Sequence, residues 1–134
     1  MSNRCYNILL CGASLTAGAI IYVLFRENTY IAIFFDRWSV LRLIQAWVGG
    51  RTWGGFQYYL PDLLWGFSLS CGMVAIWGPD CSPMWCSTGV FFGCIWELMQ
   101  RFCIVSGTAD WTDILMYLIG SGLCFIINKR RIVK

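Results

Sequence analysis

The sequence predicts an all-α membrane protein: a compact bundle of four transmembrane helices, with one interfacial amphipathic helix between the first and second spans. Hydrophobic residues make up 58% of the 134 residues and charged residues only 13%, against roughly 25% charged in soluble domains. The apolar residues also form long blocks, and many of the eight tryptophans lie near the block ends, where amphipathic rings anchor at membrane interfaces. At this length, residues 1–134 are expected to form a single domain.

Four apolar segments are long enough to cross a bilayer core of roughly 30 Å, which takes about 20 helical residues. They are predicted at about 6–25, 61–77, 83–102 and 111–128. Pro61 and Pro83 suit the first turn of a helix, where a missing N–H is tolerated. Asp110 is predicted to cap the fourth helix, with Asp113 in its first turn.

The segment at about 30–48 differs from the spans, because its apolar residues recur at helical spacing beside several polar ones. The polar residues are Asp36, Arg37, Arg42 and Gln45. A helix charged on one face is expected to lie in the membrane interface rather than to cross the bilayer. A glycine-rich loop is predicted to follow it.

Small residues recur four positions apart within the predicted spans, and such pairs let helices approach closely in lipid. The pairs are Ala13 and Ala17, Ser14 and Gly18, Ser68 and Gly72, and Gly89 and Gly93. The pattern argues for a compact bundle. It leaves open whether the packing lies within one chain or between chains, so a homo-oligomer and a membrane-protein partner both stay open.

Basic residues bear on the orientation of the bundle. Four spans place both termini on one side, and the two sides then carry equal numbers of basic residues. A dense cluster follows the last span, formed by Lys129, Arg130, Arg131 and Lys134. This cluster favours cytoplasmic termini.

Composition disfavours several classes of function. The net charge of +3 is small and most basic residues are scattered, which argues against nucleic-acid binding. The chain has no His and its eight cysteines form no C-x-x-C pair, so a Cys/His zinc site is not expected. Cysteines inside apolar runs are expected to act as small hydrophobes. The chain has no nucleophile motif and no phosphate-binding glycine loop, and no cofactor is predicted.

Polar residues within or beside apolar runs are the strongest functional signal. Glu97 and Gln100 share one helix face, and Arg101 lies four residues after Glu97, where the two are expected to pair. Placing a carboxylate in hydrocarbon is unfavourable, so such a group indicates a functional site by default. The predicted ligand-binding residues are Asp62, Glu97, Gln100, Arg101, Asp110 and Asp113, with Arg51 and Thr108 near the same face.

The three aspartates of this set each have an ordinary explanation at a helix terminus. Asp62 and Asp110 are expected as helix caps, and Asp113 is favoured by the helix dipole. Glu97 lies nearer the middle of its apolar run, and it is therefore the residue to test first.

The motifs around these residues resemble the signature of a known family. Residues 93–100 read GCIWELMQ and residues 107–113 read GTADWTD, followed by Tyr117 and Gly120. The pattern is similar to that of VanZ-like bacterial membrane proteins, which carry Glu-x-x-Gln on one helix and Asp-x-x-Asp leading into a glycine-containing last helix. The resemblance covers about 61–120, and Tyr117 stands where the family commonly has Asn. It implies a small multi-pass protein of the bacterial inner membrane, linked to tolerance of glycopeptide antibiotics such as teicoplanin.

Three interpretations of function stay open. The first is a non-enzymatic protein, or one with weak catalysis at most, that binds a polar lipid headgroup or an envelope precursor at the acidic cluster. The second is a membrane-embedded, lipid-modifying enzyme whose acids hold a divalent cation, because carboxylates suit Mg²⁺ and Ca²⁺. The third is an accessory subunit of a membrane complex. The first interpretation is preferred, and it has membrane lipids as partners without a resident metal ion.

Overall fold

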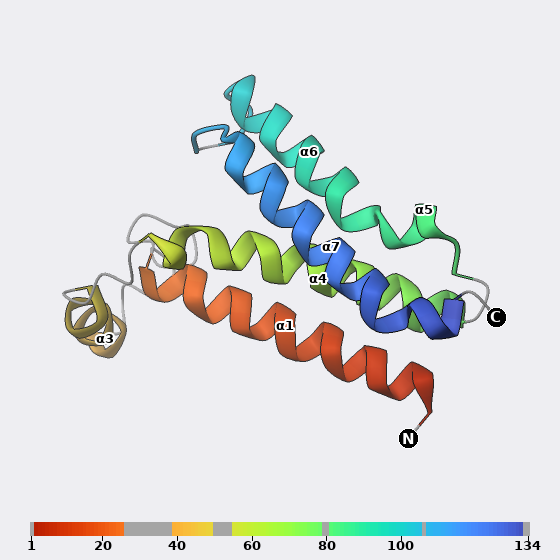
Figure 1. Cartoon of the computed structure of the whole chain (residues 1–134). Coiled ribbons are helices and arrows are strands. Elements are labelled where there is room, and N and C mark those ends of the chain that lie inside the picture. Colours follow the sequence, from red (N-terminus) through yellow and green to blue (C-terminus); the bar gives the residue numbers. More distant parts are fainter. Residues whose placement is uncertain (1, 26–38, 50–54, 79–80, 106, 133–134) are drawn as a thin grey trace.

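A computed structural model of the chain describes residues 2–25, 39–49, 55–78, 81–105 and 107–132. Its α-helices are α1 (Asn3–Phe25), α3 (Ser39–Gly49), α4 (Phe56–Trp77), α5 (Pro83–Cys86), α6 (Thr88–Arg101) and α7 (Trp111–Ile132) (Figure 1). The described residues contain no strand. The predicted all-helical class is therefore confirmed.

Three helices are long and apolar enough to cross a membrane. They are Asn3–Phe25, Phe56–Trp77 and the part of α7 from Trp111 to Lys129. The first and the last of them match the predicted spans at 6–25 and 111–128 closely. Both segments are uninterrupted apolar runs, in which helix formation satisfies every backbone polar group without water.

Helix α4 begins at Phe56, several residues before the predicted start at Pro61. Pro61 lies inside the helix, where its missing N–H removes one backbone hydrogen bond. Membrane helices tolerate such a proline because neighbouring groups compensate for the lost bond. Asp62 consequently sits within the helix and not at its N-terminus, and its predicted role as a helix cap is wrong.

The predicted span at 83–102 is divided into two helices at Ser87. The Ser87 hydroxyl donates to the Pro83 carbonyl at 3.0 Å, and the Thr88 hydroxyl donates to the Trp85 carbonyl at 2.6 Å. Hydroxyl groups that bond to backbone carbonyls in this way compete with the regular helix. Helix α6 has 14 residues, which at ~1.5 Å per residue make about 21 Å, less than a bilayer core.

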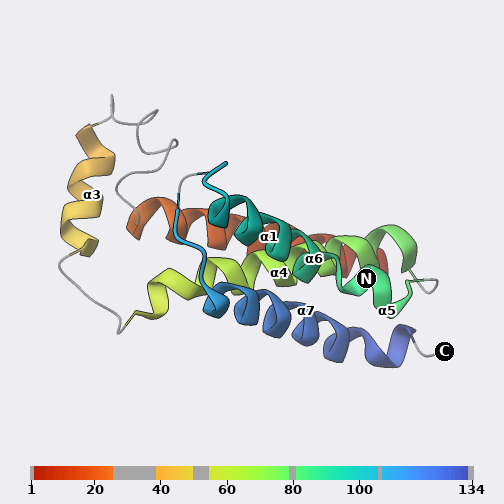
Figure 2. The same ribbon diagram turned by 90° about the horizontal axis from the view of Figure 1, so that it is seen from above.

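Helix α4 is central to the bundle, because it packs along both α1 and α7. Helix α6 runs beside α7 and also contacts α4 (Figures 1 and 2). The N- and C-terminal ends lie together at the end of the bundle where α4 leads into α5 (Figure 1). The opposite end of the α6–α7 pair holds the turn between these two helices.

Glycines allow the central helices to approach at backbone distance. A Cβ atom added to Gly66 of α4 would lie 2.8 Å from the Tyr117 carbonyl oxygen of α7. A Cβ on Gly120 of α7 would overlap the Leu63 carbonyl of α4, and one on Gly89 of α6 would meet the Gly66 carbonyl at 2.5 Å. Three helices therefore converge around one crossing that only glycine permits.

Two of the other small-residue pairs make contacts within this chain, whereas Ala13 of the remaining pair is exposed. Gly18 of α1 lies against Trp65 of α4. The Ser68 hydroxyl of α4 donates to the Cys11 carbonyl of α1 at 2.9 Å. Intrachain packing thus accounts for pairs whose sequence pattern left the partner open.

Of the predicted interfacial helix at about 30–48, residues 30–38 lie outside the described residues. Helix α3 covers the remainder, and Leu43 and Trp47 on it are exposed. The Gln45 side chain donates to the Val23 carbonyl of α1 at 2.8 Å. This hydrogen bond holds α3 at the end of α1.

Candidate functional site

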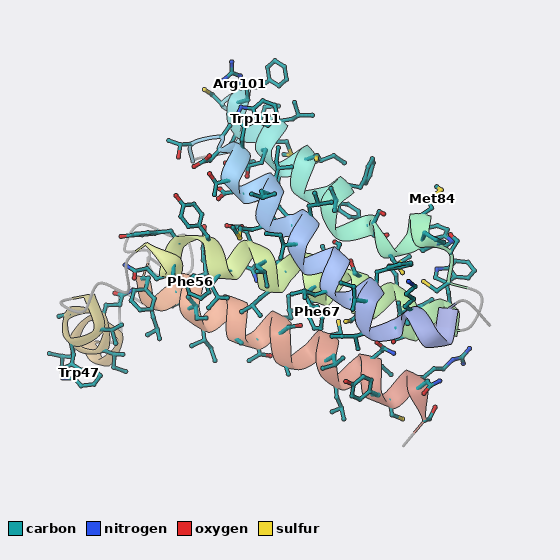
Figure 3. The ribbon with its side chains drawn as sticks, in the orientation of Figure 1. Trp47, Phe56, Phe67, Met84, Arg101 and Trp111 are labelled. Carbon is teal, nitrogen blue, oxygen red and sulfur yellow. The ribbon has the colours of Figure 1, made fainter. Side chains whose placement is uncertain are left out.

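The candidate site lies where α6 ends and α7 begins, beside the first half of α4. Figure 3 labels Arg101 and Trp111 at this end of the α6–α7 pair. The predicted site residues divide by exposure into a buried and an outer group. The buried ones are Asp62, Glu97 and Gln100. The outer ones are the exposed Arg101 and Asp110 and the half-buried Asp113.

Glu97 is only 5% exposed, and its carboxylate holds the turn that leads into α7. Its Oε2 atom accepts a hydrogen bond from the Asp110 backbone N–H at 2.8 Å. This bond supplies the partner that the Asp110 backbone donor requires. Glu97 therefore has a structural role that its sequence position did not reveal.

Gln100 secures the same turn one helical turn further along α6. With its amide oriented to satisfy both neighbours, Gln100 donates to the Thr108 carbonyl at 3.1 Å and accepts from Trp96 Nε1 at 3.0 Å. Gly107 lies against this amide with φ +143°, and a Cβ there would meet Gln100 Cδ at 2.8 Å. The turn thus depends on a glycine that can adopt positive φ and leaves room for Gln100.

Asp110 caps α7, as the sequence predicted. Its Oδ1 atom accepts hydrogen bonds from the Thr112 N–H and the Thr112 hydroxyl, both at 2.9 Å. These two bonds hold the pKa of the Asp110 carboxyl below its ordinary value. Asp113 follows in the first turn of the helix, also as predicted.

The cap gives a pH dependence that can be measured. Because the folded-state pKa of Asp110 is lowered, its contribution to stability is complete above the unfolded value of 3.8 and is lost as the pH falls through the folded value. We expect the melting temperature of the wild type to fall more than that of Asp110→Asn between about pH 6 and pH 3, since Asn caps without titrating. An equal fall of the melting temperature in both proteins would contradict this role of Asp110.

Asp62 meets α7 through Tyr117. The Tyr117 hydroxyl donates to Asp62 Oδ1 at 3.0 Å, across the crossing of α4 and α7. Asp62 is 8% exposed, and Tyr117 is buried as well. This bond joins α7 to α4 inside the bundle.

Tyr117 also connects Asp62 with the other acids. Asp62, Glu97 and Asp113 all lie close enough to Tyr117 to act on it electrostatically. They come from α4, α6 and α7 respectively. Of these acids, Asp62 makes the hydrogen bond to the phenol, whereas Glu97 and Asp113 act on it through space.

Arg101 takes a different place from the one predicted. It is exposed, and no ion pair joins it to Glu97 in the described part of the chain. The spacing of four residues was correct for neighbours on a helix face, but the Asp110 backbone N–H is the hydrogen-bond donor at Glu97. The predicted ion pair is wrong. Arg51, expected near the same face, lies outside the described residues.

Two site residues were not identified as such from the sequence, namely Tyr117 and Trp96. Tyr117 lies four residues after Asp113, on the same face of α7, and this spacing was the available signal. Trp96 received no role from the sequence, and in the structure its Nε1 donates to the Gln100 amide at 3.0 Å. Among the described residues, no group of three or more Asp, Glu, Cys or His side chains is arranged to hold a metal ion.

Comparisons of the chain with protein-family models, with curated proteins and with solved structures give no significant match.

Proposed function

We propose that this protein is a multi-pass membrane protein that binds a polar lipid headgroup or an envelope precursor at the acidic end of α6 and α7. One observation carries the proposal: two buried polar side chains bond to the turn that presents two outer carboxylates, and a third bonds to α7 beside it, at one end of helices long and apolar enough to cross a membrane. The buried side chains are Asp62, Glu97 and Gln100. The outer carboxylates are Asp110 and Asp113.

The arrangement of the helices supports four membrane crossings. Helix α4 ends at the opposite end of the bundle from the start of α7 (Figure 1), so the chain returns through α5 and α6. Residues 83–101 would reach about 28 Å as helix, close to the thickness of a bilayer core. In this proposal α3 lies in the interface, where its exposed Trp47 would anchor. The termini are cytoplasmic, beside the basic C-terminal cluster.

The charge of the site defines the class of ligand. Asp62, Glu97, Asp110 and Asp113 contribute carboxyl groups, and the exposed Arg101 ends α6 near the start of α7 (Figure 3). Such a surface favours a headgroup with an amine or several hydroxyl groups. The ligand would contact Asp110 and Asp113 directly, with Arg101 placed to meet a phosphate. Asp62, Glu97 and Gln100 would form the floor behind them.

Lipid mass spectrometry of the purified protein tests this proposal. Glu97→Gln keeps an acceptor for the Asp110 N–H, so the turn should persist. It also replaces a carboxyl group with a neutral amide, which weakens the attraction of the site for a cationic headgroup. We expect this variant and Asp113→Asn each to co-purify about fivefold less of the bound lipid, which corresponds to about 1 kcal/mol. Arg4→Gln is the matched control. It also replaces a charged side chain with an amide, but near the start of α1, away from the site. Lipid contents unchanged in both site variants would refute the proposal.

Membership of the VanZ-like family, and with it a bacterial inner-membrane location and a link to glycopeptide tolerance, is part of the proposal. It rests on Glu97 and Gln100 followed by Asp110 and Asp113. The paired contacts of Glu97 and Gln100 with the turn at 107–110 give this motif a physical reason, because both side chains fix the backbone that places the two aspartates.

A cation-dependent enzyme remains the alternative, and metal analysis with and without chelator would distinguish it. Nothing in the described residues favours it, because the acids around Tyr117 do not form a set of metal ligands. An accessory-subunit role draws no support from the small-residue pairs at Gly18, Ser68 and Gly89, which pack within the chain.

A further inference from the structure

Five cysteines gather at the end of the bundle that holds both termini, away from the acidic site. They are Cys11, Cys71, Cys81, Cys86 and Cys124. Four of the sulfurs meet in two pairs, Cys71 with Cys124 at 3.2 Å and Cys81 with Cys86 at 3.6 Å, and the Cys11 sulfur contacts the Ser68 hydroxyl at 3.4 Å. All are free thiols. The sequence showed no C-x-x-C pair, and the contact between Cys81 and Cys86 arises because the single turn of α5 brings residue 86 back towards residue 81, with the Cys86 N–H donating to the Ser82 carbonyl at 3.2 Å.

We propose that Cys81 and Cys86 form a thiol–disulfide site, which a disulfide-containing oxidant converts to an intramolecular disulfide that closes residues 81–86 into a ring around α5. The two sulfurs are already in van der Waals contact. The Cys86 backbone is held in place, because its carbonyl accepts a hydrogen bond from the Ser70 hydroxyl of α4 at 2.6 Å. Closing the bond therefore requires movement mainly at Cys81.

The reaction is an exchange in which atoms and electrons balance. The thiolate of one cysteine attacks a sulfur of the oxidant and expels a thiolate, which leaves a mixed disulfide. The second cysteine then attacks the protein sulfur of that mixed disulfide and expels the second thiolate. The two thiol protons pass to the two released thiolates. The pair loses two hydrogens and the oxidant is reduced to two thiols.

Position distinguishes this pair from Cys71 and Cys124. Those two lie inside α4 and α7, fully buried and several residues from the nearest helix end, whereas Cys81 precedes α5 and Cys86 lies in the first turn of the proposed crossing at 83–101. Cys81 and Cys86 are 1% and 3% exposed, but Ser82, Pro83, Met84 and Trp85 between them are exposed. A water-soluble oxidant therefore reaches the two thiols when the exposed segment 82–85 opens locally. Burial also raises the pKa of the Cys81 thiol, so the exchange accelerates as the pH rises.

Peptide mapping of the full-length protein in detergent micelles tests the site. The reduced protein is treated with oxidised glutathione, free thiols are alkylated, and the segment 81–86 is analysed by mass spectrometry. We expect this segment to lose two hydrogens and to take no alkyl label, more slowly than the exposed Cys5 and Cys103 become modified. Cys81→Ser and Cys86→Ser each abolish the loss. Cys103→Ser, the matched control at an exposed thiol, leaves it unchanged.

The result for the wild-type protein tests the proposal without any substitution. If serine at the buried position prevents folding, Cys81→Ala provides an apolar variant. Two outcomes would overturn the proposal. One is a segment 81–86 that keeps both alkylated thiols after Cys5 and Cys103 have reacted completely. The other is a disulfide that joins Cys81 or Cys86 to Cys71 or Cys124 instead.

Discussion

Gly120→Ala is expected to destabilise the protein by about 3 kcal/mol, the upper range for overpacking a tight interface. A methyl group at this position overlaps the Leu63 carbonyl and lies 2.8 Å from the Phe67 backbone nitrogen. Both neighbours are backbone atoms of α4 and cannot rotate away, so α7 must separate from α4. The free energy of unfolding in mixed detergent micelles measures the effect.

Gly122→Ala is the matched control in the same helix. A Cβ atom at Gly122 meets nothing within 4 Å, and alanine favours helix over glycine by about 0.8–1.0 kcal/mol. This variant should be as stable as the wild type or more stable. Equal destabilisation by the two substitutions would show that the crossing of α4 and α7 does not depend on close approach at Gly120.

Tyr117→Phe should lower the free energy of unfolding by about 1.5 kcal/mol, near the maximum measured for hydrogen bonds within membrane proteins. The substitution keeps the ring that packs over Gly93 of α6 and removes only the donor to Asp62 Oδ1. The value lies at the upper end because the acceptor is a buried carboxyl group. Reversible unfolding in detergent provides the measurement.

A double-mutant cycle with Asp62→Ala separates this bond from general effects. Directly bonded side chains couple, so the double variant should lose about 1 kcal/mol less than the sum of the single variants. Tyr58→Phe is the control, since Tyr58 is an exposed tyrosine of α4, and it should change stability by less than about 0.5 kcal/mol. Additive losses at Asp62 and Tyr117 would contradict the bond.

The sequence predicted the long helices well and their interruptions poorly. Helices α1 and α7 are unbroken apolar runs, so hydropathy alone located them. The sequence predicts a helix start at Pro61, because the first turn of a helix suits proline in water-soluble proteins. In α4 the helix continues through it. The break at Ser87 was missed because Ser87 and Thr88 act through hydroxyl bonds that leave no trace in hydropathy.

At the candidate site, residue types were predictable but their partners were not. Helical spacing correctly placed Glu97 and Gln100 on one face. It could not show that this face closes over the turn at 107–110, where both side chains bond to backbone groups. Asp62 differs from its prediction. The sequence predicts a helix cap, whereas the structure buries Asp62 beside Tyr117. Asp62 is therefore a stronger candidate for the site than the sequence indicated, and Glu97 has a structural role in addition.

The most direct measurement is an experimental structure of the protein in lipid nanodiscs formed from the lipid that co-purifies with it. The proposal predicts density for a headgroup within hydrogen-bonding distance of Asp110 or Asp113, above the floor formed by Asp62, Glu97 and Gln100, and loss of that density in Glu97→Gln. A wild-type site occupied by water alone, with lipid headgroups elsewhere on the bundle, would contradict the claim that the acidic end of α6 and α7 binds them.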